Sequence, residues 1–165
     1  MSRSALLAAL LLVSVPVLAG EPSAGGKAAL VEHGRYVVMI GGCNDCHTAG
    51  FAQAGGKLPE SAWLLGDSLG WSGPWGTTYA PNLRLRIAGM DADAFKAYAR
   101  GLVTRPPMPY WAVNAMSDRD LEAMHAFITT LGPAGELAPA ALPPGVVARG
   151  PVVQFPAPPP ALATR

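Results

Sequence analysis

The most constraining feature of this 165-residue chain is the run Cys43-Asn44-Asp45-Cys46-His47. Two cysteines separated by two residues can each form a thioether with one of the two vinyl groups of a single haem, and a histidine directly after them can give its imidazole to the iron. Segments that would otherwise need a sheet can then pack on the porphyrin. We predict one haem c, attached covalently through Cys43 and Cys46, with His47 as an iron ligand.

Other uses of a cysteine pair fit this sequence less well. A thioredoxin-like redox pair needs a strand before it and a helix after it, but residues 30–40 have the pattern of a helix and a glycine-rich loop follows the motif. A structural zinc site needs four ligands, whereas the chain has two cysteines and its other histidines, His33 and His125, fall in different predicted helices. A disulfide would close a very small loop and stabilise little.

The amino terminus has the pattern of a secretory signal. A basic start with Arg3 precedes an apolar run over residues 5–13, and the small residues Val17 and Ala19 come just before Gly20. We predict cleavage near Ala19, a periplasmic location and no membrane span in the mature protein. A retained anchor is the alternative, but the apolar run is short for a membrane span. Export agrees with the motif, because bacteria attach haem c outside the cytoplasm.

Composition divides the chain into three predicted parts: a signal peptide over residues 1–19, a single-haem domain over 20–132 and a proline-rich tail over 133–165. The prolines keep the tail out of a helix, so it should run extended and add little to the haem-binding core. Loss of the signal would leave eleven basic and eleven acidic residues. Such a balance provides no basic face, and we exclude nucleic acid as a partner.

Three helices are predicted in the middle of the chain, over residues 27–40, 91–101 and 117–131. Asp91 and Ser117 are placed to cap the second and third of them. Residues 48–90 are rich in glycine and proline, and we expect this segment to pack on the porphyrin as a long loop. The chain is therefore predicted to be all-α, with no sheet.

Candidates for contacts with the haem propionates lie near the end of that loop. They are Asn82, Arg84 and Arg86, although each of them could equally be a solvent-exposed residue.

Met108 is the predicted second iron ligand, on the side of the haem opposite His47. It lies between Pro107 and Pro109, and the stiff backbone lowers the entropy cost of holding a weakly binding thioether against iron. Met116 is the alternative ligand. The other sulfur and imidazole candidates are interpreted as core, cap-adjacent or surface residues: Met39, Met90, Met124, His33 and His125.

Several further segments resemble class I cytochromes c, in particular small exported bacterial ones related to the haem domains of periplasmic dehydrogenases. The matching segments, in order, are Gly34-Arg35-Tyr36, the motif with Thr48, Tyr79-Ala80-Pro81-Asn82-Leu83, Pro107-Met108-Pro109-Tyr110, Ser117 to Leu121 and Phe127 to Leu131. The resemblance covers residues 30–132. It implies a cytochrome c fold, with three main helices and long loops around one haem. It also implies His/Met ligation, electron transfer, and first and last helices that cross near Gly34 and Phe127.

These features predict an electron carrier and not an enzyme, because the sequence shows no nucleophile with a base and no suggestive pair of carboxylates. The expected partners are redox proteins of the periplasm, either a dehydrogenase or a terminal oxidase or reductase. One alternative is a dedicated electron-accepting subunit of a dehydrogenase complex. The other is a haem enzyme or gas sensor, if Met108 leaves the iron open.

Overall fold

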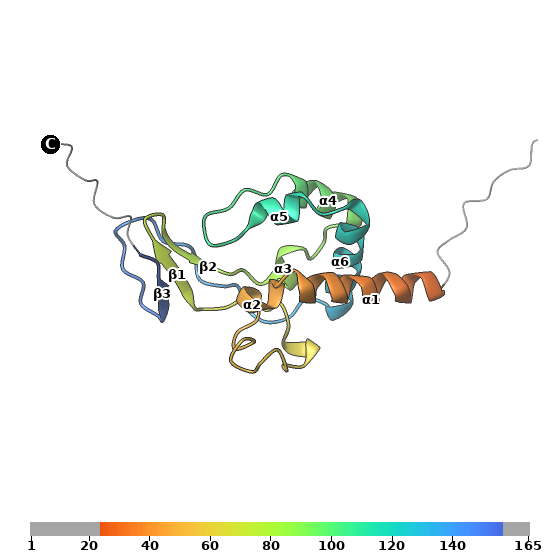
Figure 1. The fold of residues 1–165 in the computed structure, drawn as a ribbon, viewed down its shortest axis with the longest axis horizontal. Helices are drawn as coiled ribbons and strands as arrows, with labels where there is room; N and C mark the ends of the chain where they lie inside the picture. The colour runs from red at the N-terminus through yellow and green to blue at the C-terminus, as the bar shows by residue number, and fades with distance from the viewer. Residues whose placement is uncertain (1–23, 157–165) are drawn as a thin grey trace, which may run out of the picture.

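Six α-helices and one small sheet make up residues 24–156, the part of the chain that this computed structural model describes. The predicted signal peptide and its cleavage point lie outside these residues. Figure 1 shows the helices gathered around α1 and the sheet at the end of the molecule away from the start of α1. The helices are α1 (Ala24–Ile40), α2 (Cys43–His47), α3 (Leu83–Arg86), α4 (Ala92–Arg100), α5 (Tyr110–Asn114) and α6 (Asp118–Leu131).

The three longest helices, α1, α4 and α6, agree with the three that the sequence predicts. Their starting points follow from the predicted caps. The Asp91 carboxylate accepts a hydrogen bond from Ala94 N at 2.8 Å, and Ser117 Oγ accepts one from Asp120 N at 3.1 Å. Each cap satisfies a backbone N–H that has no partner within the first turn of a helix.

Helices α1 and α6 cross at Gly34, in agreement with the crossing that the resemblance implies. A Cβ atom at Gly34 would lie 1.8 Å from the carbonyl oxygen of Ala123 and 2.8 Å from Phe127 Cβ. The absence of a side chain therefore lets the backbones of the two helices touch. A second contact joins the same helices, because His33 Nε2 lies 2.8 Å from Asp120 Oδ1.

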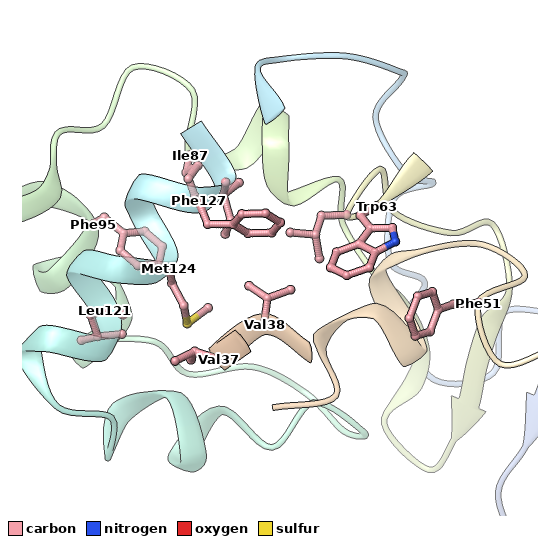
Figure 2. Close-up of a cluster of buried hydrophobic side chains, with 12 residues drawn as sticks. Val37, Val38, Phe51, Trp63, Ile87, Phe95, Leu121, Met124 and Phe127 are labelled. Carbon is pink, nitrogen blue, oxygen red and sulfur yellow. The ribbon is translucent and has the colours of Figure 1, made fainter. Parts of the chain in front are cut away.

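The hydrophobic core lies between α1, α4, α6 and the loop that follows the cysteine motif. In Figure 2 the side chains of Phe127, Trp63 and Val38 converge at its centre. Phe127 and Trp63 form an edge-to-face pair with ring centroids 6.1 Å apart. The buried members of the cluster are Val37, Val38, Phe51, Trp63, Leu64, Ile87, Phe95, Ala99, Leu121, Met124, Phe127 and Ile128.

The prediction of an all-α chain without a sheet is wrong, since the described residues include a three-stranded sheet in the order β2-β1-β3. Strand β1 (Gly70–Gly73) pairs antiparallel with β2 (Gly76–Tyr79) and parallel with β3 (Val152–Gln154). Glycine, a poor strand former, fills three of the eight positions in β1 and β2. These strands form because a distant part of the chain pairs with them, and local sequence carries no sign of that pairing.

The third strand belongs to the proline-rich tail, whose described part, residues 133–156, runs back across the molecule. Leu142 and Thr77 exchange two backbone hydrogen bonds, at 2.8 and 3.0 Å. The Asn82 side-chain amide donates to the carbonyl of Ala134 at 2.8 Å, and the ring of Phe155 packs edge-to-face on Trp75 at 5.1 Å. These contacts are more extensive than we expected of a tail that adds little to the core.

None of the helices in the described part of the chain is both long enough and apolar enough to cross a membrane.

Candidate functional site

The cysteine motif forms a helix of its own, α2, directly after a turn at the end of α1. Gly42 has a φ of 66°, a left-handed conformation that glycine adopts without strain. This turn lets the chain change direction within two residues, so that α2 begins at Cys43. Cys43, Cys46 and His47 then lie on a single helical turn, as three groups that bind one cofactor must.

The imidazole of His47 is buried and held by the chain. Its Nδ1 lies 2.8 Å from the carbonyl oxygen of Pro81. Because a carbonyl only accepts hydrogen bonds, Nδ1 carries the proton and Nε2 is left with a free lone pair. Burial lowers the pKa of His47 from 6.5, although the bond to Pro81 opposes this shift. The ring is therefore neutral at pH 7, which is the form that binds a metal ion.

The two thiols are free and do not resemble those of a redox-active pair. Burial raises the pKa of Cys43 to about 11 and also raises the pKa of Cys46. Catalytic thiols of disulfide oxidoreductases have lowered pKa values instead. The element before the motif is α1 and not a strand. Among residues 24–156 there is also no group of three or more histidine, cysteine or acidic side chains that could hold a metal ion.

Met108 lies half-buried in the loop over residues 102–109, between α4 and α5. The base of this loop is closed by Asn114, whose side-chain amide donates to the carbonyls of Ala99 at 2.6 Å and Leu102 at 3.2 Å. Arg105 holds the middle of the loop against the strands, because its Nη1 donates to the carbonyl of Trp75 at 3.0 Å. The loop that carries Met108 is thus held at both its base and its middle.

Two other methionines have clear packing roles. Met124 is 4% exposed and belongs to the core, as predicted. Met116 packs beside the start of α2, since a Cβ atom at Gly41 would lie 3.6 Å from Cys43 Sγ and 3.8 Å from Met116 Cε. Met39 differs from its prediction as a core residue, because it is 39% exposed.

The two histidines outside the motif are occupied by other contacts. Nε2 of His125 lies 2.8 Å from the carbonyl oxygen of Met90, and Nε2 of His33 faces Asp120. These contacts agree with the prediction that neither is an iron ligand.

Two of the three residues suggested for the haem propionates serve the fold instead. Arg84 is only 8% exposed, and its guanidinium donates to the carbonyls of Ser61, Leu131 and Gly132, so it caps the end of α6. Asn82 caps α3 by accepting from Leu85 N at 3.0 Å. Arg86 is exposed.

Other polar atoms of the described chain fit a cofactor that carries carboxylates. Trp75 Nε1, Thr78 Oγ1 and Thr104 Oγ1 are buried and have no hydrogen-bond partner among the described residues. Haem carries two propionates, which can accept hydrogen bonds from such groups. The free Nε2 of His47, the adjacent free thiols and these unpaired polar atoms are all consistent with covalently bound haem.

Sequence reasoning missed the carbonyl of Pro81, which orients His47, and the role of Asn114 in closing the Met108 loop. Pro81 lies in the segment Tyr79-Ala80-Pro81-Asn82-Leu83, which contributed to the resemblance above, so its importance had a signal in the sequence. Asn114 had none, because its partners are backbone carbonyls 12 and 15 residues away.

Comparison with curated proteins finds relatives among the subunits of dehydrogenases. The chain is 31% identical over 132 residues to the cytochrome c subunit of a quinone alcohol dehydrogenase from Gluconacetobacter polyoxogenes, a match that covers 73% of this chain and 25% of the relative. It is 27% identical over 143 residues to the fructose dehydrogenase cytochrome subunit of Gluconobacter japonicus, covering 79% and 28%. A subunit of the nicotinate dehydrogenase of Pseudomonas putida is 30% identical over 126 residues, covering 69% and 10%.

These matches agree with the resemblance to cytochromes associated with dehydrogenases. In each case the matched part is a quarter or so of the relative, or less. No family model and no solved structure matches the chain. Membership of class I and the presence of a single haem therefore stay predictions.

Proposed function

We propose that this protein is an electron-transfer cytochrome with one haem c, bound covalently through Cys43 and Cys46. The observation that carries the proposal is the geometry of α2. That short helix places both thiols beside a neutral imidazole whose Nδ1 is bonded to Pro81, which leaves Nε2 for the iron. The names of the relatives, which are cytochrome subunits, support a haem cofactor.

In this proposal His47 Nε2 and the Met108 sulfur are the two axial ligands. Haem iron supplies reversible one-electron chemistry, and a methionine ligand raises its reduction potential. The chain keeps both ligands in place whichever oxidation state is present. His47 is fixed by the Pro81 carbonyl, and Met108 is carried by a loop that Asn114 and Arg105 hold. Electron transfer through such a site needs no proton donor or nucleophile from the protein.

The proposed location is the periplasm, after removal of residues 1–19, and the proposed electron donor is a dehydrogenase. An independent shuttle and a dedicated subunit of a dehydrogenase complex are both consistent with this chemistry. The second is favoured by the relatives, each of which is named as a subunit of a dehydrogenase. Purification of a tagged protein from its native host separates the two. A stoichiometric dehydrogenase that survives gel filtration at high salt identifies a subunit, and a free monomer identifies a shuttle.

Covalent attachment is tested by exporting the protein in a host that has a cytochrome c maturation system. We expect the band to keep its haem stain after denaturing electrophoresis, and Cys43→Ser combined with Cys46→Ser to abolish it. The single variant His47→Ala should affect the spectrum of the iron more than the thioether bonds themselves. A stain that persists in the double cysteine variant, or is missing from the wild-type protein, would contradict the proposal.

A further inference from the structure

An arginine in the Met108 loop has a charge that the described chain does not neutralise. Arg105 is half-buried, and its Nη1 donates to the carbonyl oxygens of Trp75 and Leu142, both at 3.0 Å. These bonds leave Nε and Nη2 free, and within residues 24–156 the guanidinium has no ion-pair partner. A cation removed from water in this way is stabilised when an anion lies beside it.

Three uncharged groups with the same property lie on segments that Arg105 joins. Thr104 Oγ1 is next to Arg105 in the chain, Trp75 Nε1 belongs to the residue whose carbonyl Arg105 holds, and Thr78 Oγ1 follows on β2. All three atoms are buried without a partner among the described residues. Leaving a buried donor unpaired costs about 1–3 kcal/mol, so such groups usually bind something.

Trp75 and Thr78 lie on the same face of the sheet. Thr77 points to the opposite face, where its hydroxyl donates to Ser72 Oγ at 3.2 Å, so the side chain of Thr78 lies on the other side. The ring of Trp75 covers that same side, because a Cβ atom at Gly73 would lie 2.5 Å from it.

We propose that Arg105, Thr104, Trp75 and Thr78 form the binding site for a propionate of the haem. A guanidinium, two hydroxyls and an indole N–H are all hydrogen-bond donors, and a carboxylate is an acceptor with about four lone-pair positions. Both unpaired features, the charge and the three donors, are removed by one ligand of this kind. The inference rests on the proposed function, and it replaces the sequence candidates Asn82 and Arg84, which are used in helix caps.

Arg105 thereby has two tasks: it fixes the Met108 loop, and it pairs with the cofactor. The test has to separate them. Arg105→Gln removes the charge, Arg105→Lys keeps it, and Arg86→Gln is the matched control, because it makes the same substitution at an exposed arginine on α3. Each variant is prepared as the haem-loaded protein. The readouts are the midpoint potential and the propionate-bending bands in the resonance Raman spectrum, which shift with hydrogen bonding to these groups.

We expect Arg105→Gln to shift a propionate band and to lower the midpoint potential, since an unpaired carboxylate stabilises ferric iron. Arg105→Lys should retain the wild-type potential in part, and Arg86→Gln should leave both readouts at their wild-type values. If Arg105→Gln alters only the Met-ligand band or the stability, with the propionate bands unmoved, Arg105 is a loop clamp alone and the inference is wrong.

Thr104→Val together with Thr78→Val provides a second arm that leaves the arginine clamp in place. This double variant should shift the same propionate band, and an unchanged band would also overturn the inference. It decides the matter if Arg105→Gln fails to mature. A wild-type protein without covalent haem would refute the proposed function instead, and the haem stain shows this before any variant is compared.

Discussion

Replacing Gly34 with alanine should destabilise the protein strongly, although alanine is the better helix former. The new Cβ atom would lie 1.8 Å from the carbonyl oxygen and 2.4 Å from the carbonyl carbon of Ala123. Both are backbone atoms of α6, so no change of rotamer relieves the contact. The oxygen distance has to grow beyond 3.0 Å, and α1 and α6 must therefore separate where Val38 and Phe127 pack between them.

The magnitude follows from two opposing terms. Alanine stabilises a helix interior by about 1 kcal/mol relative to glycine. Overpacking a tight core costs about 1–3 kcal/mol when side chains can adjust, and more when backbones must move apart and lose contacts on both sides. We therefore expect Gly34→Ala to lower the free energy of unfolding by about 3 kcal/mol net, out of a total of about 5–15 kcal/mol for a domain.

The assay is denaturant unfolding of the haem-loaded protein, followed by circular dichroism. Gly101→Ala is the matched control, because Gly101 has a φ of −90° and a methyl group added there would have Ala97 O as its nearest atom, at 3.5 Å. It should change stability by less than about 0.5 kcal/mol. Adding Phe127→Ala to Gly34→Ala should not restore stability, because the clash with the Ala123 backbone is untouched. A Gly34→Ala protein as stable as the wild type would refute the reasoning.

Three further predictions concern the ligand, the tail and a helix cap. Met108→Ala should remove the weak deep-red charge-transfer band of the oxidised protein, lower its potential and let carbon monoxide bind, whereas Met116→Ala should do none of these; the reverse pattern would move the ligand to Met116. Ending the chain after Gly132 should lower the free energy of unfolding by at least about 2 kcal/mol, at about 1 kcal/mol for each of the two hydrogen bonds between the tail and β2; unchanged stability would show that the tail is dispensable. The Ser117 hydroxyl, followed by His33, holds the pKa of Asp120 below its ordinary value of 3.8. The stabilisation is therefore present at neutral pH and lost as the pH falls through the lowered value. Ser117→Ala should cost about 1 kcal/mol at pH 7, and the difference from wild type should shrink in acid; a constant difference from pH 7 to pH 2 would contradict the linkage.

Local sequence was sufficient wherever a feature depends on neighbouring residues. The cysteine motif places its three groups on one turn of helix whatever surrounds it, and the caps Asp91 and Ser117 act on the backbone within three residues. Helical spacing of apolar residues likewise identified α1, α4 and α6. The crossing at Gly34 came from the resemblance, and the reason for it, contact with the Ala123 carbonyl, is visible only in the structure.

Tertiary structure alone decided the features that join distant segments. The sheet forms because β3 pairs with a strand about eighty residues earlier, although glycines in β1 and β2 conceal any strand pattern. Arg84 is polar and looks like a surface residue, yet carbonyls at the end of α6 bind it. The sequence of residues 43–47 determined which atoms can bind a haem. Only the fold, through the Pro81 carbonyl, determined which nitrogen of His47 is free to bind iron, because a hydrogen bond across 34 residues sets the tautomer.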